Sequence, residues 1–521
     1  MVFNPTYSDV FVSETQLVNI IAEIGWGTSA IVLASDRGPL TPQYVTNTRQ
    51  FKQLYGPNNP AISFAHYCAL DVINGGGAVW CLRVAADDTM YAAQGLLDSG
   101  SFADLDAVND DTLNLTGLDM DEHTSFGVYP TGPGAFGNNI AVQVTATNPK
   151  DNTFKLNVFV SPNMNNPVEI WTVTKTQGQV NGLSGQSQYI EDVVNVFSNF
   201  IRVMDNPASN FMPTAVSAVR LFTNGADGSA VGDSHLINGW TAFNDYRAYP
   251  NVNILLNGGY TTPAVQTQML LTAETRGDGI AVLDMPFLST APQAAITYRD
   301  TTLNANSSWG AIQTPWYLRN DEDNNNNLFV PPSGAKAARM LYASNNAYPW
   351  QASAGVNYGV IPNAMGLSYL YQDAERAIIE DPYEINPITS EPGYGICFQN
   401  DKTLQSYLGP MSYVSSRVLV IIIRGSIKNF LQTIRWEPND QYTRIRVVSA
   451  INSLLTLIQG QRGLASFNTV CDSTNNTDYT MLQGQLIVDV TLQPVFPIEK
   501  IMLNLIITAN EVQVNVAQST T

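Results

Sequence analysis

The most constraining feature of the sequence is a strand–helix–strand pattern near the middle of the chain. The apolar run VNILL (252–256) is followed by a Gly-Gly turn and then by apolar residues at helical spacing. Thr262 fits a helix N-cap, Pro263 fits the first helical turn, and Gly277 fits a C-terminal stop. The strand IAVLD (280–284) comes next. Because such a unit closes as a right-handed parallel crossover, the pattern predicts an α/β sheet.

The length of 521 residues leaves room for two to four domains, at roughly 100 to 200 residues per domain. Between residues 92 and 225 the texture changes to short alternating apolar runs separated by Asn, Gly and Pro clusters. The alternating positions are Ile140, Val142 and Val144, then Phe154, Leu156 and Val158, then Val168 and Ile170. This texture predicts a β-rich insert, closed by a helix near residues 189–200.

The segment 415–435 combines two conflicting signals. Its β-branched run favours a strand, whereas Leu419, Ile423 and Ile427 recur at helical spacing over a longer distance than an ordinary strand. We therefore predict a helix. Four basic residues of this segment then share one face, opposite the apolar one: Arg417, Arg424, Lys428 and Arg435.

Charge is distributed unevenly along the chain. The formal net charge is −19, which works against a surface that binds nucleic acid through Lys and Arg. Eight basic and three acidic residues between positions 401 and 462 give that region +5, so the remainder carries −24. Such an asymmetry suits a self-assembling or docking surface. The alternative is that the basic residues form a solvated helix face.

Both ends of the sequence carry short strand-like patterns. At each end, apolar residues stand among polar neighbours: Val10, Phe11 and Val12 near the N-terminus, and Val512, Val514 and Val516 near the C-terminus. Each strand could simply pair at the edge of its own domain's sheet. The N-terminus lacks the basic and apolar regions of an export signal, and no apolar run approaches the ~20 residues of a membrane helix. We therefore expect cytosolic synthesis without export.

Motifs for catalysis, cofactors and metals are weak. The four cysteines are scattered, which predicts buried free thiols, and three histidines without ligand spacing give little material for a metal site. The chain has no phosphate-binding GxxxxGK motif, no GxSxG and no HExxH. The run DEDNNNN (321–327) reads as an exposed loop. We therefore expect no catalytic residue, no cofactor and no metal. The alternative is a soluble α/β enzyme with a ligand near Gly258 and Gly259, at the 252–284 crossover.

Several stretches together resemble the tail sheath proteins of contractile-tailed bacteriophages, a family related to R-type pyocins and other contractile injection systems. The strongest similarity lies in the C-terminal third: WEPND (436–440), VCDSTNNT (470–477) and GQLIVDVTLQPVFPIEKIMLNLIIT (484–508). Earlier stretches that resemble the family are PTYSDVFVSE, GWGTSAIVLASDRGPLTPQYVTNTRQFKQLYG (25–56), NGGGAVWCLRVA (74–85), GPGAFGNNIAVQV (132–144), IAVLDMP (280–286), VPPSGAKAARM (330–340) and YPWQASAG (348–355).

The resemblance implies a multidomain α+β or α/β fold whose core is built from both ends of the chain, with a β-rich outer domain inserted into it. The expected parts are an N-terminal arm (1–20), an N-terminal core part (21–91), the insert (92–225), an α/β core region (226–400), a C-terminal tube-proximal domain (401–508) and a C-terminal arm (509–521).

The resemblance also implies a non-enzymatic structural subunit of the virion tail. Such subunits polymerise as a helix of stacked rings, hexameric in the family, around a tail tube and contract to drive the tube through the host envelope. The implied partners are the tail tube, baseplate and terminator proteins, without nucleic acid or membrane insertion. The arm residues named above would add strands to neighbouring subunits. The basic residues expected to face the tube or a neighbour are Arg417, Arg424, Lys428, Arg435, Arg444 and Arg446.

Overall fold

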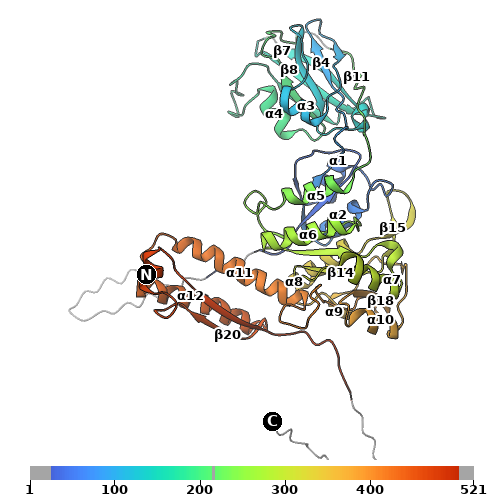
Figure 1. Ribbon diagram of the computed structural model, residues 1–521. Coiled ribbons are helices and arrows are strands. Elements are labelled where there is room, and N and C mark those ends of the chain that lie inside the picture. The colour runs from blue at the N-terminus through green and yellow to red at the C-terminus, as the bar shows by residue number, and fades with distance from the viewer. Residues whose placement is uncertain (1–20, 22–24, 149, 214–216, 504–521) are drawn as a thin grey trace, which may run out of the picture.

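The computed structural model describes residues 21, 25–148, 150–213 and 217–503. The chain is a mixed α/β structure with several separate sheets. Figure 1 shows a β-rich part at one end, an α/β body in the middle, and a pair of long helices that projects sideways from the body. The predicted arm residues at both ends of the chain lie outside the described residues.

The body is built on an eight-stranded sheet that combines distant parts of the chain. Its central strands are parallel, and an antiparallel strand lies at each edge. In spatial order the strands are β19 (Gly395–Phe398), β18 (Asn386–Glu391), β14 (Gly310–Thr314), β13 (Ile280–Asp284), β12 (Val252–Leu256), β1 (Thr28–Leu33), β3 (Ala78–Arg83) and β2 (Gln43–Val45).

Helices cover both faces of this sheet, because its strands are apolar on both sides. In β1, Ile31 and Leu33 face one core, and Ala30 and Val32 face the other. The first core is formed with α1 (Thr48–Tyr55), α2 (Ala65–Asn74), α8 (Ser333–Asn346), α11 (Val414–Ile434) and α12 (Gln441–Gly460). The second involves α5 (Asp233–Ala242), α6 (Pro263–Arg276), α7 (Pro292–Thr297), the π-helix η3 (Tyr298–Leu303) and α10 (Asp373–Glu380). Two short elements complete the body, η2 (Phe287–Ser289) and α9 (Gly355–Tyr358).

The predicted crossover is confirmed at the level of single residues. Strands β12 and β13 have the predicted bounds and pair in parallel. Pro263 opens α6, and Gly277 ends it with φ of 68° in the left-handed region. Thr262 holds the N-cap position, but its hydroxyl donates to Asp233 instead of capping the helix.

The β-rich part contains two four-stranded sheets between residues 94 and 221. One consists of β10 (Ile201–Asp205), β6 (Thr124–Pro130), β4 (Gln94–Leu97) and β5 (Phe102–Asp104). The other consists of β11 (Arg220–Leu221), β7 (Ile140–Asn148), β8 (Thr153–Val160) and β9 (Glu169–Val173). The accompanying helices are α3 (Asp110–Thr116), η1 (Ala135–Asn139) and α4 (Ile190–Phe197).

Alternation predicted the buried face correctly in β7 and β8, where all six of the predicted positions are buried. It fails in the third run, because Val168 and Ile170 are 46% and 56% exposed. Ile170 lies on the face of β9 opposite to Trp171 and Val173, which pack against the core of the β-rich part.

The run at 321–327 is mostly exposed, as its composition predicted, but its first residue, Asp321, is buried. The run forms the tight end of a hairpin between β15 (Tyr317–Asp321) and β16 (Asn326–Val330), with β17 (Gly366–Leu367) on the other side of β15. Asp321 is fully buried and accepts hydrogen bonds from the Tyr67 hydroxyl and the Asn324 amide. These contacts explain why an acidic residue of this run points into the protein.

The C-terminal region forms the projecting helix pair. The predicted helix at 415–435 is confirmed as α11, and α12 returns beside it (Figure 1). A two-stranded antiparallel sheet then lies against the helices, formed by β20 (Leu464–Val470) and β21 (Asp489–Pro494), with α13 (Asp478–Leu482) between them in sequence. We call this sheet the terminal hairpin.

The four cysteines are buried free thiols, as predicted. Among the described helices, none combines the length and apolar character of a membrane span.

Candidate functional site

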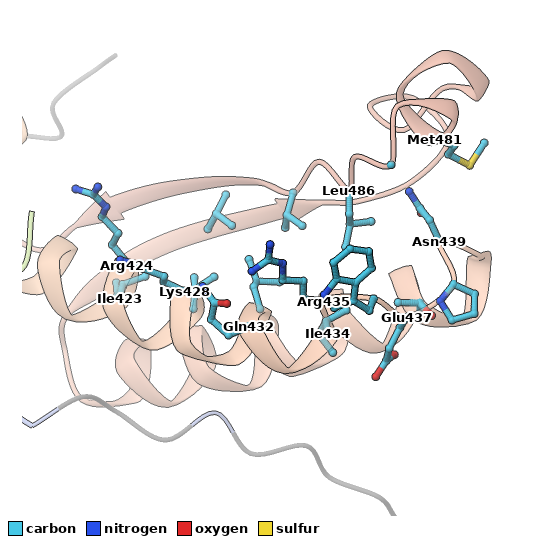
Figure 2. Close-up of a pocket in the computed structure, with 18 of the residues that line it drawn as sticks. Ile423, Arg424, Lys428, Gln432, Ile434, Arg435, Glu437, Asn439, Met481 and Leu486 are labelled. Carbon is cyan, nitrogen blue, oxygen red and sulfur yellow. The ribbon is translucent and has the colours of Figure 1, made fainter. Parts of the chain in front are cut away.

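An apolar groove of about 1130 Å³ runs along α11. Its floor is one face of α11, its wall is the terminal hairpin, and its end is the turn between α11 and α12 (Figure 2). We call it the hairpin groove. Its apolar lining includes Val420, Ile423, Ile427, Leu431, Leu486, Val488, Val490 and Leu492.

The groove exists because α11 is apolar on two faces. Val418, Leu419 and Ile422 are buried against the body and α12. Ile427 and Leu431 are only partly buried, and both line the groove. A helix that is apolar on two faces needs two partners, and the terminal hairpin covers the second face incompletely.

The wall of the groove ends in an unpaired strand edge. Along β21, Val490 and Leu492 point into the groove, whereas Asp489, Thr491 and Gln493 are exposed. Within the described residues β21 pairs only with β20, so its second edge has backbone groups without a strand partner. An apolar floor beside a free strand edge has the geometry that accepts one further strand.

Three of the predicted basic residues line this groove. Arg424, Lys428 and Arg435 lie along α11 and at its end, beside the apolar lining (Figure 2). This corrects the expectation that the basic residues lie opposite the apolar face, because α11 has a second apolar stripe next to them. Lys428 Nζ lies 4.0 Å from the centroid of the Tyr246 ring. None of the three has a carboxylate within ion-pair distance among the described side chains, although Asp278 is near enough to Lys428 for their charges to interact and Glu437 also lines the groove.

The other predicted basic residues are engaged elsewhere. The Arg417 guanidinium lies 4.1 Å from the centroid of the Trp309 ring and donates to Ser308. Burial, together with the charge of Arg424, lowers the pKa of Arg417 to about 10. Arg444 donates to the Asn439 side chain at 2.9 Å, and Arg446 pairs with Glu437. Arg417 therefore links the start of α11 to the body, whereas Arg444 and Arg446 hold the turn between α11 and α12.

The exposed turn between α11 and α12 adds an aromatic side chain to the groove. Trp436 lines the groove, is 92% exposed and has φ of 77°, a left-handed conformation that is unusual for an aromatic residue. The sequence carries one signal for the groove. Every residue from 418 to 423 is apolar, so this part of the helix has apolar side chains on all sides. Such a run indicates burial on more than one side.

The crossover that could have held an enzyme's ligand is filled by protein. A Cβ atom on Gly258 would lie 2.9 Å from that of Ala65, and the Gly259 amide donates to Asp284. The Tyr260 hydroxyl contacts Ser63 and accepts from the Ala34 amide. A ligand placed there would have to displace these contacts. No cluster of three potential metal-ligating side chains occurs in the described part of the chain.

Comparison with known proteins supports the resemblance noted from the sequence. Residues 410–508 match the family model of the phage tail sheath C-terminal domain. The tail sheath protein of Vibrio phage KVP40 is 28% identical over 211 residues, covering 40% of this chain and 31% of the relative. The tail sheath protein of Enterobacteria phage T4 is 24% identical over 318 residues, covering 57% and 48%. The chain therefore spans less than half the length of these curated relatives.

Solved structures show that the fold is shared more widely than the sequence. A sheath complex of an extracellular contractile injection system, PVC, in the contracted state, has a TM-score of 0.54 at 14% identity, covering 97% of this chain and 99% of that chain. The sheath tail protein of Listeria innocua has a TM-score of 0.58 at 12% identity, covering 91% and 96%. At these identities the likeness describes the fold. The resemblance to tail sheath proteins is confirmed.

Proposed function

We propose that this chain, whose residues 410–508 match a phage tail sheath C-terminal domain, is a structural subunit of a contractile tail sheath. Copies of the subunit polymerise helically around a tail tube in the virion, and the polymer contracts to drive the tube through the host envelope. The match of 410–508, the region that forms the helix pair and the terminal hairpin, carries this proposal. The activity is mechanical, and the proposal involves no catalytic site or cofactor.

We infer the following architecture for the polymer. The eight-stranded sheet and the helix pair form the core, which combines N-terminal and C-terminal parts of the chain, and the insert at 92–225 is the outer domain. Residues 401–508 lie nearest the tube. Stacked hexameric rings, together with tube, baseplate and terminator proteins, complete the tail.

The hairpin groove is proposed to bind a terminal arm of a neighbouring subunit. An arm that adds to the free edge of β21 would gain main-chain hydrogen bonds, and its alternate apolar side chains would cover Ile427 and Leu431. The pattern at Val512, Val514 and Val516 fits this role, as does the triplet Val10 to Val12 for the other arm. Strand addition tethers subunits while their bodies move, because it needs only the arm and the hairpin.

Electron microscopy of the purified chain at increasing concentration, without partners, tests the proposal. We expect hollow striated tubes. A chain that stays monomeric at every concentration, and also when purified tail tube is added as a template, would contradict the sheath function.

A further inference from the structure

The chain segment that follows the terminal hairpin crosses back to the body. Residues 495–500, which we call the strap, run from the end of β21 to the place where α11 leaves the body (Figure 1). At the start of the strap the Val495 amide donates to the Gly463 carbonyl at 3.1 Å. Further along, the Phe496 ring lies 6.2 Å from the ring of Tyr413.

Glu499 makes the central contacts of the strap. Its carboxylate accepts a hydrogen bond from the Tyr413 hydroxyl at 2.9 Å and lies 3.5 Å from Lys402 Nζ. The Glu499 and Lys402 side chains are only 24% and 11% exposed, so solvent screens this pair less than an ordinary surface pair. A carboxylate held by a cation and a hydroxyl at once has little freedom to turn away.

Both partners of Glu499 are fixed to rigid parts of the body. Lys402 and Tyr413 face each other in an antiparallel bridge, and Tyr413 holds the N-cap position of α11. The Lys402 amide donates to the Asn386 side chain at 2.7 Å, and the Asn386 amide group donates to the Lys402 and Ile312 carbonyls. Through Asn386 and Ile312 these contacts reach the central sheet.

The last residue of the strap adds a weaker contact. Lys500 Nζ lies 3.8 Å from Asp381, but their side chains are 68% and 62% exposed. A pair this exposed contributes little to stability. Glu499 is therefore the main attachment point.

The strap determines where a force on the C-terminal arm enters the subunit. Without it, tension would act on the Pro494 end of β21 and would break the antiparallel pairing with β20 one bond at a time. With it, tension meets the contacts of Glu499 first. We propose that the strap is a mechanical anchor that transfers tension from the C-terminal arm to the central sheet and to the start of α11, and so protects the terminal hairpin from being peeled open.

This inference rests on the proposed function, in which the arm tethers neighbouring subunits during contraction. The anchor can nevertheless be tested in dilute monomer, so a failure to polymerise does not affect the result. Because all four native cysteines are buried, new cysteines at Ser390 on β18 and at Leu503 provide selective attachment points.

Spin labels at these two positions test whether the strap is attached. We expect a narrow distance distribution in the parent chain and in the control Glu322→Gln, which removes an exposed carboxylate elsewhere. In Glu499→Ala the distribution should become broad, and in Tyr413→Phe, which retains the ring, it should broaden less. A broad distribution in the parent chain, or one that Glu499→Ala leaves unchanged, would overturn the proposal.

Optical-tweezer pulling between the same two positions tests the route of the force. We expect the strap and the terminal hairpin to give way together in the parent chain and in Glu322→Gln, at the force that releases Glu499. In Glu499→Ala the hairpin should open at lower force. Equal opening forces in all three chains would show that the strap carries no tension.

Discussion

At the scale of single residues, the buried carboxylate of Asp284 makes the fold sensitive to pH. It lies at the end of β13 and accepts hydrogen bonds from the Ser333 amide and hydroxyl, each at 2.7 Å. Burial raises the pKa of Asp284 to about 7, although these hydrogen bonds oppose the shift. The proton is therefore retained in the folded chain at pH values where the unfolded chain has lost it.

We expect Asp284 to cost stability as pH rises. The protonated carboxyl contributes its full stability below the pKa of the unfolded chain, about 3.9, and this stability is lost as pH rises toward 7. The loss is about 1.4 kcal/mol for each unit by which the folded pKa exceeds the unfolded one. Denaturant unfolding of the parent chain and of Asp284→Asn between pH 4 and 8 measures this difference. The parent should lose stability relative to the variant up to about pH 7 and then run parallel to it. Parallel curves over the whole range would contradict the assignment.

The buried pair of Lys336 and Asp401 fixes the start of α11. Lys336 Nζ lies 3.2 Å from Asp401, and the side chains are 1% and 5% exposed. The second carboxylate oxygen of Asp401 accepts from the Ser415 amide in the first turn of α11. Burial lowers the pKa of Lys336, while the charge of Asp401 opposes this shift.

Removing one partner of this pair should be costly. We expect Lys336→Met to destabilise the body by about 3 to 5 kcal/mol, because Asp401 would remain buried without its cation. The double variant Lys336→Met with Asp401→Asn should recover part of the loss. A double-mutant cycle measured by chemical denaturation checks this coupling, and additive effects would show that the pair does not act as a unit.

At the scale of elements, the hairpin groove combines an apolar floor with basic residues that form no ion pair with a described carboxylate. Both proposed arms carry acidic residues beside their apolar ones, Asp9 and Glu14 in the N-terminal arm and Glu511 in the C-terminal arm. Reversing the charge of the groove should therefore weaken the binding of an arm and, with it, assembly. We expect Arg424→Glu with Lys428→Glu to raise the concentration needed for tube formation by about tenfold or more.

The double variant Arg49→Glu with Lys155→Glu is the matched control. Both residues are exposed, and the change in net charge is identical. Light scattering over a concentration series measures both variants. If the control is impaired to the same extent, total charge and not the groove governs assembly.

At the scale of the whole molecule, assembly should depend on one face of the C-terminal arm. We expect a chain truncated after residue 510 to fold normally, as judged by circular dichroism, and to form no tubes. Replacing Val512, Val514 and Val516 with Asp should have the same effect, since these side chains would meet the apolar floor.

Substitutions on the alternate positions provide the control for the arm. Gln513→Asp with Asn515→Asp adds negative charge to the other face of the same segment, so assembly should be affected much less. Tubes of normal length from the truncated chain would refute strand exchange through this arm.

The sequence determined those features that depend on neighbours in the chain. Apolar spacing, a proline and a glycine predicted α6 and its flanking strands. Helical periodicity predicted α11, although the β-branched composition of this segment favoured a strand. Alternation identified the buried faces of β7 and β8, and the motifs of the C-terminal third identified the family resemblance. These signals are local, because a cap, a turn or a periodic stripe involves residues close in sequence.

Which surfaces remain uncovered depends on the packing of the elements in space. This packing placed Ile170 outward on an edge strand, buried Asp321 in a hairpin, and divided the basic residues between the groove and internal contacts. The groove and the strap each join segments far apart in the chain, such as Lys402 and Glu499. No local pattern encodes such a pairing, because it depends on how the packed elements bring distant residues together.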